Sequence, residues 1–456
     1  MRIRTRLMIA SAVAVAAVAG SCAVALARPF NHLIPVRFGS QPTISQCEQQ
    51  YGFACYNAFE LERAYGAFPL YGRGINGAGS TIVLVDSYGS PTIQHDLAVY
   101  DAANHLPAPP TFNIIAPAGP IPPFNPKNGD MVGWAEETTL DVELSHTIAP
   151  GAAILLVETP VSETEGVTGL PEMIYSENYV IDHHLGNIIS QSWGATEQTF
   201  QNASGDFDPS LILGLTSAYT NAAANGVTVL AATGDAGATD YELDGTTLYT
   251  YPVVDFPADD PLVTAVGGLQ LSLDGFGSRT APDTVWNDPA SVCPPPCAGN
   301  GGLSAVFDRP TYQDSVQSVV GNARGLPDVS LSASVTGAVN TYTSFVAPSQ
   351  GVPGPGWYPE AGTSEASPLM AGEVALADQV AGHSLGLINP ALYAIGDGPG
   401  SGLTDITLGN NTVTFPQGGS NVTVTGWNAA PGYDLASGLG EPNGSFPQQL
   451  AAFAGS

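Results

Sequence analysis

Thr81-Ile-Val-Leu-Val-Asp-Ser87 is the first of five short apolar runs that decide the fold of this chain. The other four are AAILLVET (152–159), NIISQSW (187–193), VTVLAATG (227–234) and LVTAVGG (262–268). Helix-length segments separate these runs, and the alternation predicts βαβ units with a parallel sheet covered by helices. We therefore expect an α/β fold with a mostly parallel central sheet. Functional residues of such sheets gather at the carboxyl ends of the strands.

The composition is that of a globular protein with few and mostly negative charges. Of 456 residues, 44% are hydrophobic and 11% are charged, and 41 acidic residues stand against 11 basic ones. A surface of this sign repels nucleic acid and anionic membranes, so neither is expected as a partner. A carboxylate-rich surface also loses its self-repulsion as the pH falls. The composition is therefore suited to an acidic medium, although halophilic proteins share it.

The first 27 residues have the pattern of a secretory signal peptide. Three arginines precede an apolar stretch, which ends in the small-residue sequence Ala25-Leu-Ala27. This order predicts cleavage near Ala27, export from the cell and no stable membrane insertion afterwards. A membrane anchor through the same stretch is the alternative, and a lipoprotein cysteine at Cys22 is a further one.

Four cysteines remain after Cys22, in two close pairs. Cys47 and Cys55 form one pair, and Cys293 and Cys297 form the other. In an exported protein such pairs predict two local disulfides. Zinc is the alternative for Cys293 and Cys297, but the sequence has no histidine or further cysteine near them.

Gly362-Thr-Ser364-Glu-Ala-Ser-Pro368 is the strongest local signal of chemistry. A helical pattern begins at Thr363, so Ser364 would lie among the unpaired N–H groups of a helix amino end. Those groups can hold the oxyanion of an attacked carbonyl. Ser364 could equally be a helix-capping residue.

Two carboxylates, Glu137 and Asp141, could serve this serine as its base. Their spacing of four places both on one face of a helix. If they are buried, they share one proton, and the proton-free member can accept a proton from serine. A solvated acidic helix face is the alternative, because Glu136 and Glu143 flank the pair.

A third carboxyl, Asp235, follows an apolar run in Thr233-Gly-Asp-Ala-Gly237. Such a sequence is usually only a turn. A carboxyl held protonated there could instead donate a hydrogen bond to an oxyanion. No histidine in the chain is followed by Gly-Thr, so a histidine base of the subtilisin kind is not indicated.

Together these segments resemble the sedolisins, the serine-carboxyl peptidases with a subtilisin-like fold. The family motifs are a helix with E-x-x-x-D, a strand ending in S-x-S-W-G, a strand ending in S-G-D-S-G, and G-T-S-x-A-x-P. This chain has them in the same order, with Ser190-Gln-Ser-Trp-Gly194 as the second. The resemblance runs from about Ala64 to Gly440.

The resemblance implies a role for each matched residue. Ser364 would be the nucleophile, Glu137 its general base and acid, and Asp141 the residue that orients Glu137. Asp235 would form the oxyanion hole with the Ser364 N–H group. The substrates would be polypeptides, cleaved by a monomer at acidic pH. They would pair with a cleft segment formed by Ser190, Ser192, Trp193 and Gly194.

A calcium site near the carboxyl end also follows from the resemblance. The family builds it from an Asp-Ile pair and a later G-x-G-x-D. The matching residues here are Asp405, Ile406, Ala430, Gly432 and Asp434. Carboxylates and backbone carbonyls are oxygen ligands of the kind that Ca²⁺ takes.

The expected organisation is a signal peptide (1–27), a short irregular lead or pro-region (28–75) and a peptidase domain (76–456) that includes the calcium region. The lead is shorter than the prodomain with which most sedolisins are made. Further departures are Thr233 and Ala236, where serine is usual, and Glu365 beside the nucleophile. A catalytically silent secreted binding protein is the alternative to an active peptidase.

Overall fold

The computed structural model describes residues 32–294, 296–396 and 402–454. The expected signal peptide and Cys22 lie outside these residues. No helix in the described part of the chain is both long enough and apolar enough to cross a bilayer.

A central sheet organises the fold, and all five apolar runs contribute strands to it. Within the described residues it has eight strands, in the order β10-β9-β7-β5-β2-β4-β3, with β13 also pairing with β9. The strands are β2 (Thr81–Ser87), β3 (Phe112–Ile115), β4 (Ala153–Thr159), β5 (Ile188–Gln191), β7 (Thr228–Ala232), β9 (Thr264–Gln270), β10 (Thr284–Val285) and β13 (Val329–Ser332). Only β10 pairs antiparallel with its neighbour. The predicted mostly parallel α/β sheet is confirmed.

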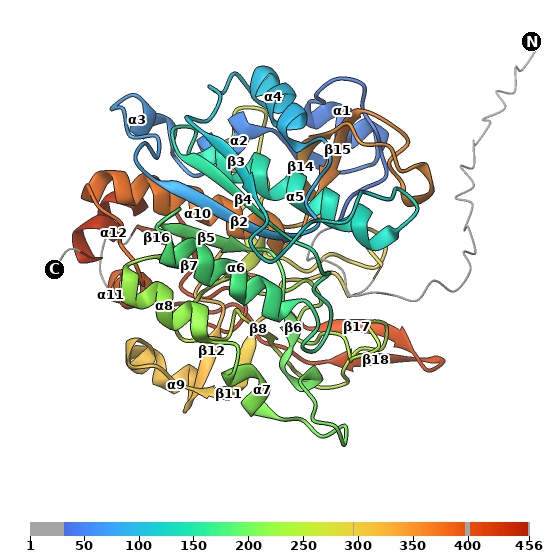
Figure 1. Cartoon of the computed structure of the whole chain (residues 1–456), viewed down its shortest axis with the longest axis vertical. Helices are drawn as coiled ribbons and strands as arrows, with labels where there is room; N and C mark the ends of the chain where they lie inside the picture. Colours follow the sequence, from blue (N-terminus) through green and yellow to red (C-terminus); the bar gives the residue numbers. More distant parts are fainter. Residues whose placement is uncertain (1–31, 295, 397–401, 455–456) are drawn as a thin grey trace, which may run out of the picture.

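Helices cover both faces of this sheet (Figure 1). On one face α5 (Gly129–Ile148) packs against α10 (Thr363–Ala381), and α10 crosses β5, β7 and β9. On the other face α6 (Leu170–Asp182) packs on β2 and β4, and α8 (Ser217–Asn225) packs on β7. Alternate residues of β2 serve the two faces: Ile82 joins the α5–α10 core and Val83 the α6 core. This alternation follows from the two-residue repeat of a strand.

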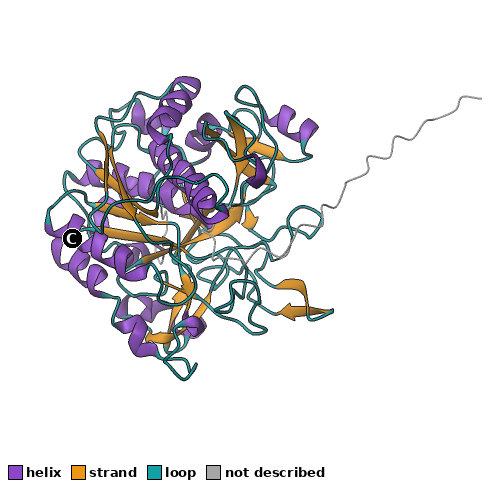
Figure 2. Ribbon diagram, turned by 45° about the vertical axis from the view of Figure 1, so that its right-hand side comes forward, coloured by secondary structure: helices purple, strands orange, loops and turns teal. Residues whose placement is uncertain are grey.

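The remaining elements surround the core (Figure 2). Helices are α1 (Ile44–Gln50), α2 (Ala58–Ala64), α3 (Phe68–Tyr71), α4 (Ile93–Asn104), α7 (Pro209–Leu213), α9 (Gln317–Val320), α11 (Asn389–Gly396) and α12 (Phe446–Ala454). Smaller sheets are formed by β1 (Ala54–Tyr56), β14 (Gly337–Thr343) and β15 (Gly356–Glu360), and by the pairs β6 (Ala195–Thr196) with β8 (Asp255–Phe256), β11 (Gly302–Asp308) with β12 (Ala323–Leu326), β16 (Leu403–Thr404) with β19 (Glu441–Pro442), and β17 (Val413–Gln417) with β18 (Ser420–Val424).

The lead is more regular than the sequence predicts. Residues 32–75 contain α1, β1, α2 and α3, and β1 pairs with β14. The structure also contains both predicted disulfides, Cys47–Cys55 and Cys293–Cys297. One of them therefore lies within this lead, where it joins α1 to β1.

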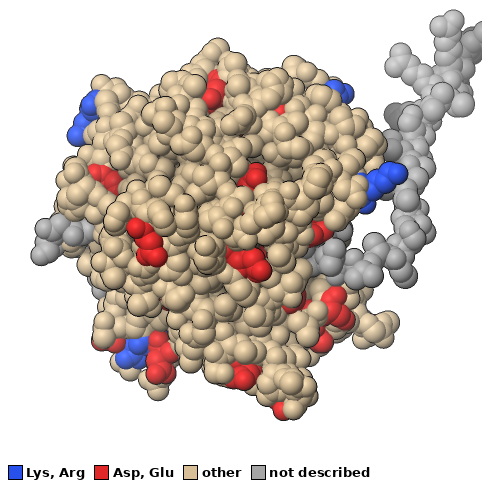
Figure 3. Space-filling view, viewed as in Figure 1, with Lys and Arg blue, Asp and Glu red and all other residues tan. Residues whose placement is uncertain are grey.

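The acidic residues are distributed differently from the expectation of a carboxylate-rich surface. More than half of the 41 are buried. The face shown in Figure 3 is mostly uncharged, with acidic side chains scattered over it. The negative composition is therefore largely a property of the interior, and the expectation based on a surface was wrong in this respect.

Candidate active site

Ser364 lies in the first turn of α10, directly beneath the end of the central sheet. The residue before the helix, Gly362, has a φ of 132°, which side-chain-bearing residues rarely adopt, and its N–H donates to the carbonyl of Ala333, 2.8 Å away. Thr363 then opens the helix, and Ser364 is fully buried. As one of the first four N–H groups of the helix, that of Ser364 has no acceptor within it.

Glu137 and Asp141 lie on α5, on the face that packs against α10. Both are completely buried, as is Glu143, two residues after Asp141. The alternative of a solvated acidic face is therefore wrong for this pair. The cause is that α5 packs between α10 and strand β14 of the β1–β14–β15 sheet. A spacing of four residues in the sequence does not reveal this packing.

The two carboxyl groups carry raised pKa values for related reasons. Burial raises the pKa of Glu137 most, and repulsion from Asp141 and then Asp86 adds to it. An interaction with the Ser364 hydroxyl acts in the opposite direction, although neither Glu137 oxygen has a hydrogen bond of ordinary geometry. Burial also raises the pKa of Asp141, with repulsion from Asp86 as the next cause.

Asp141 is held by a serine hydroxyl from a neighbouring strand end. The Ser192 Oγ atom donates to Asp141 Oδ1 at 2.6 Å, and the Ser364 Oγ atom donates to the carbonyl of Ser192 at a long 3.4 Å. Ser192 follows β5, so the carboxyl end of this strand joins α5 to α10. The spacing of the family motif gives no hint that Ser192 serves Asp141 in this way.

Asp86 is a further member of this group that the sequence analysis did not single out. It lies near the carboxyl end of β2, is fully buried and repels Asp141, and neither of its carboxyl oxygens has a hydrogen-bond partner of ordinary geometry. Burial raises its pKa as well. A polar residue in the run TIVLVDS, at the carboxyl end of a parallel strand, is the signal that could have identified it.

Asp235 follows β7 and holds the segment that precedes Ser364. Its Oδ1 atom accepts from both the N–H and the hydroxyl of Thr363, each at 2.8 Å. Asp235 is buried, and its second oxygen, Oδ2, takes no part in these hydrogen bonds to Thr363. The predicted neighbourhood of Asp235 and Ser364 is therefore present, with Thr363 as the link between them.

The Oδ2 atom of Asp235 lies 3.2 Å from Nε2 of His32. The segment from His32 to Phe38 runs antiparallel beside β15, and the His32 N–H donates to the carbonyl of Ala361 at 2.7 Å. His32 also packs edge-on against Trp286. No local pattern in the sequence indicates that a histidine of the lead lies at this site.

His32 also changes the comparison between zinc and a disulfide at Cys293 and Cys297. Ligand atoms of these three residues all lie within 4.8 Å of one another. No histidine lies near the two cysteines in the sequence, but the fold brings His32 close to them. The two sulfur atoms are joined in a disulfide, however, and a disulfide is not the thiolate pair that zinc requires.

The predicted cleft segment directs its side chains inward. Ser190 hydrogen-bonds Ser367 at 2.8 Å, and the indole N–H of Trp193 donates to the carbonyl of Val85 at 2.8 Å. Ser190, Ser192, Trp193 and Gly194 are all buried. Any pairing of this segment with an extended peptide would have to use its backbone.

The predicted calcium ligands come together at the carboxyl end of the chain. The N–H of Gly432 donates to Asp405 Oδ2 at 3.0 Å, and that of Ala430 donates to Asp434 Oδ2 at 2.9 Å. Ser437 contacts both Asp434 and the carbonyl of Ile406. Two carboxylates thus lie at one short loop whose carbonyl groups add further oxygen donors, and this set of donors fits Ca²⁺.

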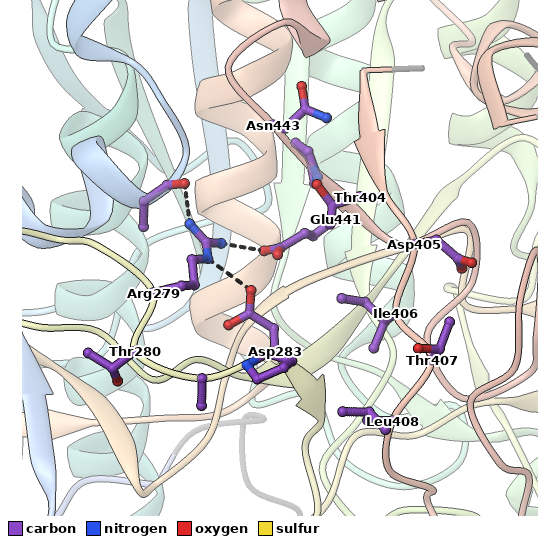
Figure 4. A pocket seen from close by; sticks show the side chains of 14 residues that line it. Arg279, Thr280, Asp283, Thr404, Asp405, Ile406, Thr407, Leu408, Glu441 and Asn443 are labelled. Carbon is purple, nitrogen blue, oxygen red and sulfur yellow. Dashed lines mark hydrogen bonds and ion pairs between the residues drawn. The ribbon is translucent and has the colours of Figure 1, made fainter. Parts of the chain in front are cut away.

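Asp405 and Ile406 also line a pocket of about 540 Å³. Figure 4 shows Arg279 on one side of this pocket, joined to Asp283 (2.9 Å) and Glu441 (2.8 Å), while the carboxyl of Asp405 points away from this ion-pair group. The candidate calcium ligands and the Arg279 group are therefore separate features of one region.

Comparisons with known proteins agree with this geometry. The profile of the subtilase family of peptidases matches residues 125–390. Kumamolisin from Bacillus sp. (strain MN-32) is 32% identical over 399 residues, which are 85% of this chain and 62% of Kumamolisin. Human tripeptidyl-peptidase 1 is 30% identical over 277 residues, 58% of this chain and 43% of that protein. The chain thus spans less than two thirds of the length of these relatives.

A solved structure also has this fold. Pseudomonas sedolisin, a serine-carboxyl proteinase complexed with two molecules of pseudo-iodotyrostatin, superimposes with a TM-score of 0.65. The match covers 88% of this chain and 98% of the sedolisin chain, at 24% identity. At this identity the likeness establishes a common fold.

Proposed function

The chain belongs to the subtilase family, in its sedolisin branch of serine-carboxyl peptidases, and on this premise we propose that it hydrolyses polypeptides at acidic pH through an acyl-enzyme on Ser364. The proposal includes export from the cell and action as a monomer. The observation that carries it is the enclosed contact between α5 and α10. Glu137 and Asp141 are buried there near Ser364, and among the described residues no histidine hydrogen-bonds the Ser364 hydroxyl.

In the proposed reaction the Ser364 Oγ atom attacks the carbonyl carbon of the scissile peptide bond, and Glu137 accepts the hydroxyl proton. The same proton then passes to the leaving nitrogen as the C–N bond breaks, leaving an ester on Ser364. Water repeats these steps to release the acid and regenerate the serine. Asp141, held by Ser192 and repelled by Asp86, orients Glu137.

The oxyanion of each tetrahedral intermediate would bind between the N–H of Ser364 and the carboxyl of Asp235. A protonated aspartic acid can donate a hydrogen bond in such a position. Asp235 already holds Thr363 through Oδ1, which leaves Oδ2 as the atom for the oxyanion. His32 lies against this atom and would have to withdraw from it.

Acidic activity has a physical basis in the same cluster. Glu137, Asp141 and Asp86 are buried together; burial raises the pKa of all three, and repulsion from neighbouring carboxylates adds to the rise for Glu137 and Asp141. Raised pKa values keep protons on the cluster, and one proton-free member is enough to act as the base. At higher pH a second negative charge would have to be accommodated in a site closed to water.

Peptide products from a denatured protein digested between about pH 3 and pH 5, mapped by mass spectrometry, test this proposal. The wild-type protein should cleave, while Ser364→Ala and Glu137→Gln should each lose at least about 1000-fold in kcat. Glu177→Gln is the matched control, because Glu177 is also fully buried with a raised pKa but lies on α6. It should retain activity.

Activity that survives Ser364→Ala would contradict the acyl-enzyme. A folded wild-type protein that cleaves nothing in this range would support the silent binding protein instead, although the intact set of four residues does not favour it. The product lengths also separate endopeptidase from tripeptidyl-peptidase action, and either mode agrees with the proposed chemistry.

We propose a bound calcium ion as a structural component of the same protein. Asp405 and Asp434 would supply carboxylate ligands, and Ile406, Ala430 and Gly432 would supply carbonyl groups. Calcium would hold together the loop before β17 and the loop that precedes β19. Its contribution would be to stability, because these loops are separate from the contact between α5 and α10.

A further inference from the structure

Glu365 follows the proposed nucleophile directly, yet its carboxyl group has no part in the reaction above. It lies in the first turn of α10 and is completely buried. Neither carboxyl oxygen has a hydrogen-bond partner. A charged group enclosed in this way is costly unless it is paired, so the neutral acid is the favoured form.

The groups around Glu365 do not compensate a negative charge. Asp235 approaches from the loop after β7 and repels it, and Ser332 of β13 offers only a hydroxyl. Three tyrosines from the lead, Tyr51, Tyr56 and Tyr65, are affected by its charge. Burial, and then repulsion from Asp235, therefore raise the pKa of Glu365 well above that of an ordinary glutamate, and Ser332 only weakens this rise.

The carboxyl groups of Asp235 and Glu365 both lie at the start of α10, but they differ in their hydrogen-bond partners. Asp235 receives two hydrogen bonds from Thr363 and lies next to His32, whereas Glu365 receives none. Glu365 belongs to the first turn of α10 and directly follows Ser364, whose N–H is to bind the oxyanion. In a medium of low dielectric constant its repulsion would act on negative charge developing several ångströms away.

We propose that Glu365 sets the upper pH limit of the peptidase, because its ionised form places an uncompensated negative charge beside the oxyanion site at Ser364 and Asp235. This inference rests on the proposed function. Glu365 does not touch the reacting atoms and acts only through the first turn of α10 and Asp235. Neutral Glu365 leaves the amino end of the helix positive.

The test compares kcat/KM from about pH 3 to pH 8 in the wild-type protein, Glu365→Gln and Glu373→Gln. Glutamine keeps the shape of glutamate without its charge. Glu373 is the matched control: it lies two turns further along α10, is buried with both oxygens unpartnered, and burial raises its pKa to about 8. Its charge is distant from the start of the helix.

Glu365→Gln should match the wild-type protein within about twofold near pH 4 and exceed it by about tenfold near pH 7. Glu373→Gln should follow the wild-type profile. Coincident profiles for Glu365→Gln and the wild-type protein would overturn the proposal. So would an equal shift in both variants, because that would indicate a general gain in stability.

Infrared spectra give a second readout that does not depend on activity. The difference between the wild-type protein and Glu365→Gln should contain a protonated-carboxyl band that persists above about pH 6. Loss of this band near pH 4 would overturn the proposal even if the protein cleaved nothing. Glu365→Ala, which needs no polar contact, replaces Glu365→Gln in both measurements if the glutamine variant does not fold. Inactivity at every pH with the band retained would instead count against the proposed function alone.

Discussion

The Nε2 atom of His32 lies 3.2 Å from Oδ2 of Asp235, so the amino-terminal segment reaches the carboxyl oxygen that the proposed reaction needs. Backbone pairing with β15 holds His32 there. The contact joins the lead to the candidate site, and it makes the state of the lead relevant to activity.

His32→Ala should raise kcat/KM, because it frees Asp235 Oδ2 for the oxyanion. The ion pair is partly exposed and contributes about 1 kcal/mol at most, so the expected gain in the full chain is up to about fivefold. His383→Ala is the control, since His383 is exposed and its ring hydrogen-bonds the carbonyl of Ser384. Peptidase assays would measure kcat/KM on purified proteins whose amino termini have been determined by sequencing. A lower kcat/KM for His32→Ala would contradict the prediction.

Ser192→Ala should lower kcat by about 10- to 100-fold with little change in KM, because Asp141 loses the donor that orients it. Ser190→Ala provides a matched comparison. Ser190 lies on the same chain segment and is also buried, but its hydroxyl bonds Ser367. Both variants should lose similar stability in urea unfolding. Equal losses of kcat would show that Ser192 supports the fold and not the carboxyl pair.

Stability should fall as the pH rises from about 4 to about 8. Burial raises the pKa of Glu62 and Glu373 to about 8 and that of Asp378 to about 7. Unfolded carboxyl groups titrate near 4, so the folded chain binds more protons than the unfolded chain between these values. The stabilisation by protonated acids is complete below the unfolded pKa and is lost as the pH approaches the folded values.

Thermal unfolding at successive pH values measures this dependence. Tm should be highest near pH 4, and Glu373→Gln should raise Tm near pH 8 by about 2–4 °C while leaving it unchanged near pH 4. A Tm that rises between pH 4 and pH 8 would contradict the assignment of buried neutral acids.

Calcium removal should destabilise the carboxyl-terminal region. A chelator should lower the Tm of the wild-type protein, and added Ca²⁺ should restore it. Asp434→Ala should have a low Tm that neither treatment changes. Asp244→Ala, which removes an exposed carboxylate from a turn, should respond to the chelator like the wild-type protein. A chelator without effect on the wild-type Tm would exclude this site as a calcium site.

Much of the fold could be predicted from local pattern. Each of the five apolar runs contains a strand, and the helix expected to begin at Thr363 is α10, which ends at Ala381. These elements have long apolar segments or a clear helical repeat, so their local signals are strong. No local pattern singles out strand β13, because its four residues in a Pro-, Gly- and Ser-rich region carry little periodic signal. Its identity as a strand depends on pairing with β9.

The candidate residues were predictable because their order and spacing match a family, but their contacts were not. Glu137 and Asp141 have the same spacing whether a helix faces solvent or the core. Only the packing of α10 on α5 buries them. Asp86 and His32 lie far from Ser364 in the sequence and reach its surroundings through sheet order and strand pairing.

The sequence by itself determined an α/β chain with a serine at a helix start, a four-spaced carboxylate pair and two local cysteine pairs. These are short-range properties, set by residue type and spacing along one or two turns. The tertiary structure decided that most of the acids are interior, that Ser192 holds Asp141 near Asp86, and that His32 meets Asp235. Proton affinity depends on burial and on neighbouring charges, and only the folded chain brings those together.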